Sequence, residues 1–220
     1  ERRFSRDVAH ELRTPIAEIR IVAEAAENAD SAPELQAALA TVVASSERMQ
    51  RSIDTLLLLA RIESGQEIPA PDPVDLAVVI GHLLDAMRPL AAERHIAFDT
   101  DLPTSAWMRG DTGMLERIAA NLLANAIEYA PTGTTVRCRI THAAAGFTLT
   151  IDNDAPNLDD DDVRRFGQRF WRGSSEGGTA RHAGLGLALT VTIAQAAGWP
   201  LAFTRRQSRL EARLGPLPKL

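Results

Sequence analysis

The chain has 220 residues, of which 45% are hydrophobic and 24% are charged, a composition typical of globular domains rather than of disordered or fibrous chains. Its net charge of -5 and its single cysteine, Cys138, exclude a global basic field for nucleic acid, an intrachain disulfide and a multi-thiolate metal site. The longest apolar run, residues 56–60, is far shorter than the ~18 residues of a membrane-spanning helix. We therefore expect a soluble chain with no nucleic-acid partner.

The first 65 residues are rich in Ala, Glu, Leu and Arg and carry apolar residues at helical spacing, which predicts two long helices. A break is expected at residues 28–33, where Asp30 or Ser31 can cap the second helix and Pro33 suits its first turn. Gly65 ends that helix. Because two such helices cannot bury their apolar stripes on each other alone, we expect a second copy of the chain to complete a four-helix bundle.

Three prolines between residues 69 and 73 exclude regular helix and indicate a linker over residues 67–73. It separates a first domain at 1–66 from a second domain at 74–220. The second domain has predicted helices at 76–92, at 113–129 and after Gly184, and predicted strands at 96–99, 136–142, 147–152, 201–205 and 210–214. This pattern predicts an α/β domain with a mixed sheet and helices on one face.

The most informative stretch surrounds His10. On a helix, His10 and Thr14 share one face and Pro15 follows directly. Val8 and Leu12 lie on another side, so we expect the imidazole to face solvent. There its ordinary pKa of ~6.5 leaves it largely neutral and nucleophilic at cellular pH. An exposed neutral histidine can attack phosphorus, although a lone histidine on a helix is more often an ordinary surface residue.

Residues 10–15 read His-Glu-Leu-Arg-Thr-Pro, which resembles the phosphoacceptor box of the bacterial sensor histidine kinases of two-component systems. Residues 59–65 are similar to the end of that family's second bundle helix. The resemblance implies that His10 carries a phosphoryl group, that Glu11 is the base or orienting carboxylate, and that Thr14 places water for the reverse, phosphatase reaction. It also implies a homodimer and a response regulator receiver domain as partner, whose aspartate accepts the phosphate.

Asn121 and Asn125 lie four residues apart on one face of a predicted helix. Their amides supply oxygens for hydrated Mg²⁺ and donors for phosphate oxygens, although such a pair alone is more often solvated surface. The run from Asn121 to Tyr129 resembles the N box of the same kinases. This implies that Asn121, Asn125 and Tyr129 bind ATP, with Mg²⁺ at Asn125 and Asn121. Glu128 departs from the family, which has a basic residue or histidine there.

The adenine site of the family carries Asp-x-Gly-x-Gly, whereas residues 152–158 here read Asp-Asn-Asp-Ala-Pro-Asn-Leu. The ungapped register places Asn153 at the aspartate position, and a neighbouring register places Asp152 there. Either side chain can accept a hydrogen bond from the adenine amino group. A carboxylate is the stronger acceptor and missing glycines tighten the pocket wall, so we predict weaker ATP binding than in members with the full motif. The similar F box is also imperfect, with Gly167 at its first Phe.

Gly184-Leu185-Gly186 resembles the family's second glycine box. The two glycines let the backbone approach phosphates, and the helix that follows directs unpaired N–H groups at them. The small, polar segment 173–179 is expected to order over bound nucleotide as a lid. Three arginines flank that lid and are candidates to neutralise the triphosphate, Arg172 among them.

The resemblance covers nearly the whole chain and implies an α + α/β fold: a dimeric four-helix bundle, then an α/β sandwich of the type shared with chaperone, mismatch-repair and topoisomerase ATPases. It implies an ATP-dependent protein histidine kinase that phosphorylates His10. The phosphoacceptor box argues against a plain ATPase. The altered adenine motif keeps open a degenerate dimer that binds no ATP and sequesters or dephosphorylates a response regulator. Because members usually carry upstream membrane segments, we expect a cytoplasmic part of a bacterial inner-membrane protein.

Overall fold

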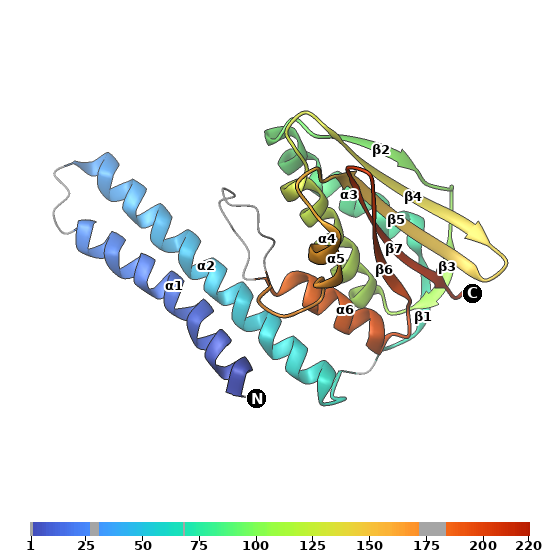
Figure 1. Ribbon diagram of the computed structural model, residues 1–220, viewed down its shortest axis with the longest axis horizontal. Helices are drawn as coiled ribbons and strands as arrows, with labels where there is room; N and C mark the ends of the chain where they lie inside the picture. Colours follow the sequence, from blue (N-terminus) through green and yellow to red (C-terminus); the bar gives the residue numbers. More distant parts are fainter. Residues whose placement is uncertain (1, 27–30, 68, 172–183) are drawn as a thin grey trace.

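The computed structural model describes residues 2–26, 31–67, 69–171 and 184–220, with side chains from Arg13 onward. A hairpin of two long helices extends away from an α/β domain (Figure 1). The hairpin consists of α1 (Arg2–Ala26) and α2 (Ala32–Glu63). The predicted helical hairpin is therefore confirmed.

The ends of α2 follow from local chemistry. The Ser31 hydroxyl accepts a hydrogen bond from the Glu34 N–H at 3.4 Å, and Pro33 stands in the first turn, where its missing N–H costs nothing. At the other end Gly65 has φ of +72°, a conformation that glycine adopts without a Cβ penalty. These are the cap and the stop that the sequence predicts.

A polar cluster joins the two helices of the hairpin. The Ser45 hydroxyl is fully buried and donates to Oε2 of Glu18 at 2.8 Å. Arg48 also donates to Glu18, and to the Ser45 oxygen at 2.8 Å. Because each buried polar group here needs its partners, the cluster fixes how α1 and α2 align.

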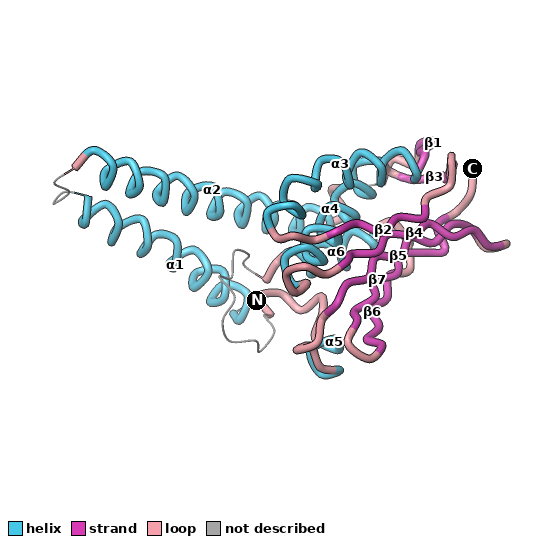
Figure 2. Tube along the Cα trace, turned by 90° about the horizontal axis from the view of Figure 1, so that it is seen from above, coloured by secondary structure: helices cyan, strands magenta, loops and turns pink. Residues whose placement is uncertain are grey.

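The α/β domain has a five-stranded sheet in the order β2-β4-β5-β7-β6, in which β2 and β4 are parallel and the other pairs antiparallel. Helices α3, α4 and α6 cover one face of it (Figure 2), which confirms the predicted mixed sheet with helices on one side. The bounds are α3 Leu76–Glu93, β2 Ala97–Asp101, α4 Thr112–Tyr129, β4 Thr135–Ala143, β5 Gly146–Asp154, α6 Gly186–Ala196, β6 Leu201–Arg206 and β7 Arg209–Leu217.

Three short elements are additional to the prediction. Strands β1 (Asp72–Asp75) and β3 (Trp107–Gly110) form a separate antiparallel pair, and α5 (Asp160–Arg164) follows β5. Strand β1 begins in the proline-rich segment 67–73 that we interpret as linker and ends in the predicted second domain. It includes Pro73, which a strand with only one paired neighbour tolerates because its other edge needs no N–H donor.

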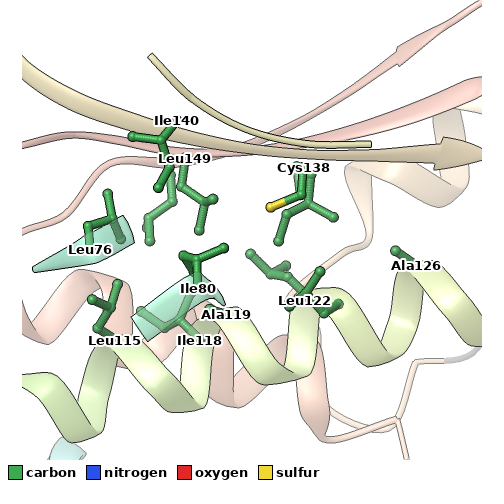
Figure 3. Close-up of a cluster of buried hydrophobic side chains, with 14 of the residues drawn as sticks. Leu76, Ile80, Leu115, Ile118, Ala119, Leu122, Ala126, Cys138, Ile140 and Leu149 are labelled. Atoms are coloured by element: carbon green, nitrogen blue, oxygen red, sulfur yellow. The ribbon is translucent and has the colours of Figure 1, made fainter. Parts of the chain in front are cut away.

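The core lies between the sheet and the helices. Figure 3 shows Ile118 and Leu122 of α4 facing Cys138 and Leu149 of the sheet, and all four side chains are buried. Burial raises the pKa of the Cys138 thiol to about 12, so this cysteine stays protonated and acts as a small apolar side chain.

The end of α2 packs against the α/β domain. Leu58 and Ile62 are buried in the same hydrophobic cluster as the sheet and helices, and Glu63 forms an ion pair with Arg169. The second bundle helix therefore continues into the core of the neighbouring domain. Among the residues that the structure describes, no helix is both long and apolar enough to cross a membrane.

Candidate functional site

The predicted phosphoacceptor lies in the first helix. His10 and Glu11 fall within α1, and their side chains lie outside the described part of the chain. Thr14 is exposed one turn further on, and α1 continues past Pro15 to Ala26. The structure thus places His10 and Thr14 on one helix, one turn apart, as the spacing predicts.

The amide pair lies on α4, half-buried, whereas the neighbouring Leu122 and Leu123 are buried in the core. Nδ2 of Asn121 donates to the hydroxyl of Thr190 at 2.5 Å, and that hydroxyl donates to the carbonyl of Gly186 at 3.0 Å. Asn121 is therefore held against the first turn of α6, and Asn125 follows one turn along α4.

Neighbouring atoms lie so close to the two glycines at the start of α6 that a side chain at either position would collide with them. A Cβ on Gly186 would lie 2.5 Å from Oδ1 of Asn121. Gly184 has φ of +66°, and a Cβ there would lie 2.8 Å from the carbonyl oxygen of Trp171. Leu185 between them is buried, and among the residues that the structure describes no side chain caps α6. The first N–H groups of this helix are thus available to an anion beside the amide pair.

Gly167 also has a structural reason. Its φ is +84°, and a Cβ would lie 2.9 Å from Cγ2 of Val191 in α6. The glycine where the family's F box has its first Phe therefore brings residues 165–171 close to α6. Phe166 of this segment packs at its edge against Phe203, with ring centroids 5.2 Å apart.

The two candidates for the adenine position point to opposite faces of the sheet. Asn153 is 4% exposed and lies on the same face of β5 as Leu149 and Ile151, which face the helices. Its Nδ2 donates to the carbonyl of Asp154 at 2.9 Å. Asp152 lies on the other face, where its carboxylate accepts a hydrogen bond from Arg209. The structure brings Asn153 to the side of α4 and α6, and does not bring Asp152 there.

The remaining predicted site residues are either exposed or outside the described part of the chain. Tyr129 ends α4 and is 62% exposed. Arg172 and the predicted lid 173–179 lie outside the described residues. Sequence reasoning missed Thr190, which holds Asn121; its position one turn after Gly186, on the same helix face, is the pattern from which it could be found.

Asp111 connects the linker to the helix that carries the amides. Its carboxylate accepts hydrogen bonds from the N–H of Met114 at 2.8 Å, as the N-cap of α4, and of Ala70 at 3.0 Å. Partial burial tends to raise the pKa of Asp111, but backbone hydrogen bonds from Met114, Ala70 and Gly113, with the charge of Arg117, outweigh it and lower that pKa below 3.8.

Two family models match the chain. Residues 1–65 match the His Kinase A (phospho-acceptor) domain, and residues 110–214 match the histidine kinase-, DNA gyrase B- and HSP90-like ATPase. The sensor-like histidine kinase SenX3 of Mycolicibacterium smegmatis is 31% identical over 199 residues, which are 88% of this chain and 51% of that protein. The chain thus spans about half the length of this curated relative.

Solved structures share the fold. The full-length structure of ShkA in complex with AMPPNP has a TM-score of 0.71 at 21% identity and covers 96% of this chain and 45% of that chain. Histidine kinase ThkA in complex with the response regulator protein TrrA has a TM-score of 0.76 at 16% identity, covering 99% of this chain and 61% of that chain.

The matched domains occur here in one polypeptide, in the order phospho-acceptor then ATPase. Together with the relatives, they show that the chain belongs to the bacterial two-component sensor histidine kinases. It carries the helical hairpin and the α/β ATPase domain of that class.

Proposed function

We propose that this chain is the catalytic core of a sensor kinase that uses ATP to phosphorylate His10 and passes the phosphoryl group to an aspartate of a response regulator. The observation that carries the proposal is the arrangement around α6. The half-buried amide of Asn121, the uncapped first turn of α6 and the inward-facing Asn153 lie on one side of the sheet. The phosphoacceptor box lies in the same chain.

The residues present fit ATP and a hard cation. Amide oxygens of Asn121 and Asn125 are ligands that suit Mg²⁺, and uncapped helix N–H groups suit phosphate oxygens. Within the described residues, no cluster of three His, Cys, Asp or Glu side chains could hold a metal alone, so we assign the cation to these amides together with the phosphates. Mg²⁺, when bound, would neutralise charge on the phosphates during transfer.

The proposed reaction is an in-line displacement at phosphorus. Asn153 accepts a hydrogen bond from the adenine amino group, and Asn121 and Asn125 position the triphosphate with the start of α6. A neutral imidazole nitrogen of His10 forms the bond to the γ-phosphorus while the bond to the bridging β–γ oxygen breaks, and ADP leaves. Glu11 orients the imidazole or takes its proton. Positioning and charge neutralisation supply most of the rate.

The reaction requires movement between the two domains. We propose domain boundaries at 1–66 and 74–220, with residues 67–73 as the hinge. Leu58, Ile62 and the Glu63–Arg169 ion pair join α2 to the ATPase domain, and we propose that some of these contacts open when the nucleotide approaches His10. Thr14, exposed beside His10, is the residue we assign to placing water in the reverse, phosphatase reaction.

The proposed partners are a second copy of this chain and a receiver domain. Large apolar side chains of both hairpin helices are exposed in the single chain, among them Ile21, Leu39 and Leu57, and a four-helix bundle would cover such faces. The solved complex of ThkA with the response regulator protein TrrA supports a response regulator as the partner. We further propose that the chain is the cytoplasmic part of a membrane-anchored sensor.

Calorimetric titration with ATP and Mg²⁺ tests the proposal. We expect saturable binding by the wild type and a large loss of affinity for Asn125→Ala, because its amide is assigned to the cation and phosphates. Gln36→Ala is the matched control, since Gln36 is an exposed amide on α2, outside the proposed nucleotide site, and it should bind as the wild type does. No saturable heat for the wild type would favour a dimer that binds a response regulator without using ATP.

A further inference from the structure

Arg209 holds the end of β5 from the sheet face opposite α3, α4 and α6. Its Nε donates to Oδ1 of Asp152, and its Nη1 lies 2.9 Å from Oδ2 of Asp154. Its Nη2 donates to the carbonyls of Thr135 at 3.1 Å and of Asp152 at 3.3 Å. All three guanidinium nitrogens are therefore engaged, and the side chain is only 21% exposed.

The two carboxylates that Arg209 binds belong to the neighbours of Asn153. Because successive residues of a strand point to opposite faces, fixing residues 152 and 154 on one face directs residue 153 to the other. The backbone adds to this restraint, since the N–H of Ala155 donates to the carbonyl of Ser208 at 2.6 Å. Arg209 thus adds a side-chain restraint to the strand pairing that presents Asn153 on the helix-covered face.

The same arrangement orients the amide. Nδ2 of Asn153 donates to the carbonyl of Asp154, the residue whose carboxylate Arg209 binds. With its NH₂ group engaged there, the amide directs its oxygen elsewhere as an acceptor. An acceptor pairs with an exocyclic amino group and not with a carbonyl oxygen at the same ring position.

We propose that Arg209 is a positioning residue for base selectivity: by holding Asp152 and Asp154, it fixes the Asn153 amide so that its oxygen recognises an amino-purine. This inference rests on the proposed nucleotide site and adds a residue on the opposite face of the sheet. Arg137 and Arg139 each lie 3.8 Å from the Asp152 carboxylate. Loss of Arg209 therefore leaves that carboxylate with cationic neighbours, and we expect the domain to fold.

Binding of ADP and of inosine diphosphate, measured by calorimetry on the full chain, tests this role. Inosine carries an oxygen where adenine carries the amino group. We expect the wild type to prefer ADP, and Arg209→Met to lower ADP affinity about tenfold, the size of one hydrogen bond to a buried group, with inosine diphosphate affinity unchanged. Arg213→Met, on an exposed arginine of the same strand, should leave both affinities unchanged.

Each result is decisive for one of the two claims. If Arg209→Met lowers the affinities for ADP and inosine diphosphate equally, or changes neither, the preference for ADP is unchanged and Arg209 has no positioning role. If the wild type shows no preference for ADP over inosine diphosphate, or if Asn153→Ala keeps that preference, the proposed adenine contact fails and the inference fails with it. Should Arg209→Met not fold by circular dichroism, Asp154→Asn removes one arm of the contact, and it must reduce selectivity for the inference to hold.

Discussion

The hairpin and the α/β domain bury their apolar residues in different ways. The α/β domain completes its core within one chain: Ile80, Leu115 and Leu123 are fully buried, and Leu58 and Ile62 from the end of α2 belong to the same cluster. The hairpin leaves Ile21, Leu39 and Val43 more than half exposed. The domain assigned to ATP can thus be stable in one chain, whereas the hairpin needs a partner to cover its faces. Stability and association should therefore respond to different substitutions.

The largest effect is expected in the α/β core. Leu123→Ala should lower the free energy of unfolding of this domain by about 3 kcal/mol, because it removes a fully buried side chain and leaves a cavity. Urea titration followed by tryptophan fluorescence measures it selectively, since all three tryptophans lie in this domain. Leu220→Ala, at an exposed position, is the control. An equal loss for both variants would contradict the assigned core.

A substitution on the hairpin should change association instead. Leu39 is 55% exposed in the single chain, and Leu39→Asp places a charge where a second copy would cover it. We expect dimer dissociation to increase by at least about tenfold, from the lost burial of one leucine, as measured by sedimentation equilibrium. The tryptophan-detected unfolding of the α/β domain should stay the same. Unchanged self-association would exclude this face from the dimer interface.

The polar cluster of the hairpin is expected to have an intermediate effect. Glu18→Ala removes the acceptor of both Ser45 and Arg48 and should cost about 1–2 kcal/mol of hairpin stability, because the two remaining groups lose a partner. Loss of helical circular dichroism on heating measures it. Glu24→Ala on the same helix, at an exposed position, should cost less than about 0.5 kcal/mol; a similar loss for both would show that the cluster adds nothing.

The smallest effect concerns Asp111. Asp111→Ala should cost about 1 kcal/mol at neutral pH, because α4 loses its N-cap. The folded-state pKa lies below the ordinary 3.8, so the ionised group stabilises the fold above that value and this contribution is lost as the pH falls through the folded-state pKa. Denaturant titrations from pH 7 downward should show the difference from wild type shrinking in acid. A difference that grows in acid would contradict this sign.

Regular periodicity made most of the fold predictable. The helix predicted at 113–129 lies at Thr112–Tyr129, and the strands predicted at 136–142 and 147–152 lie within β4 and β5. These elements follow from apolar residues that recur about every 3.6 residues in a helix and every second residue in a strand. Strands β1 and β3 were not predicted, because four residues each, one of them containing a proline, carry too little alternation.

The sequence predicts the candidate site as a set of residues but not as a spatial arrangement. The spacing of Asn121 and Asn125 places both on one face, yet only tertiary packing shows that Thr190 holds Asn121. The choice between Asp152 and Asn153 depends on which of them faces the helices, and alternation alone leaves that open. In the sequence Gly167 is only a departure from the F box, whereas the structure shows that its positive φ and its close approach to Val191 require a glycine.

The proposed kinase activity depends most on His10 as the group that receives the phosphoryl group. Incubation of the chain with γ-labelled ATP and Mg²⁺, followed by proteolysis and peptide mapping at alkaline pH, measures this directly. We predict acid-labile, alkali-stable label on the peptide that contains His10, and no label on the His10→Gln variant. Label that persists in His10→Gln, or that maps to another peptide, would contradict the assignment.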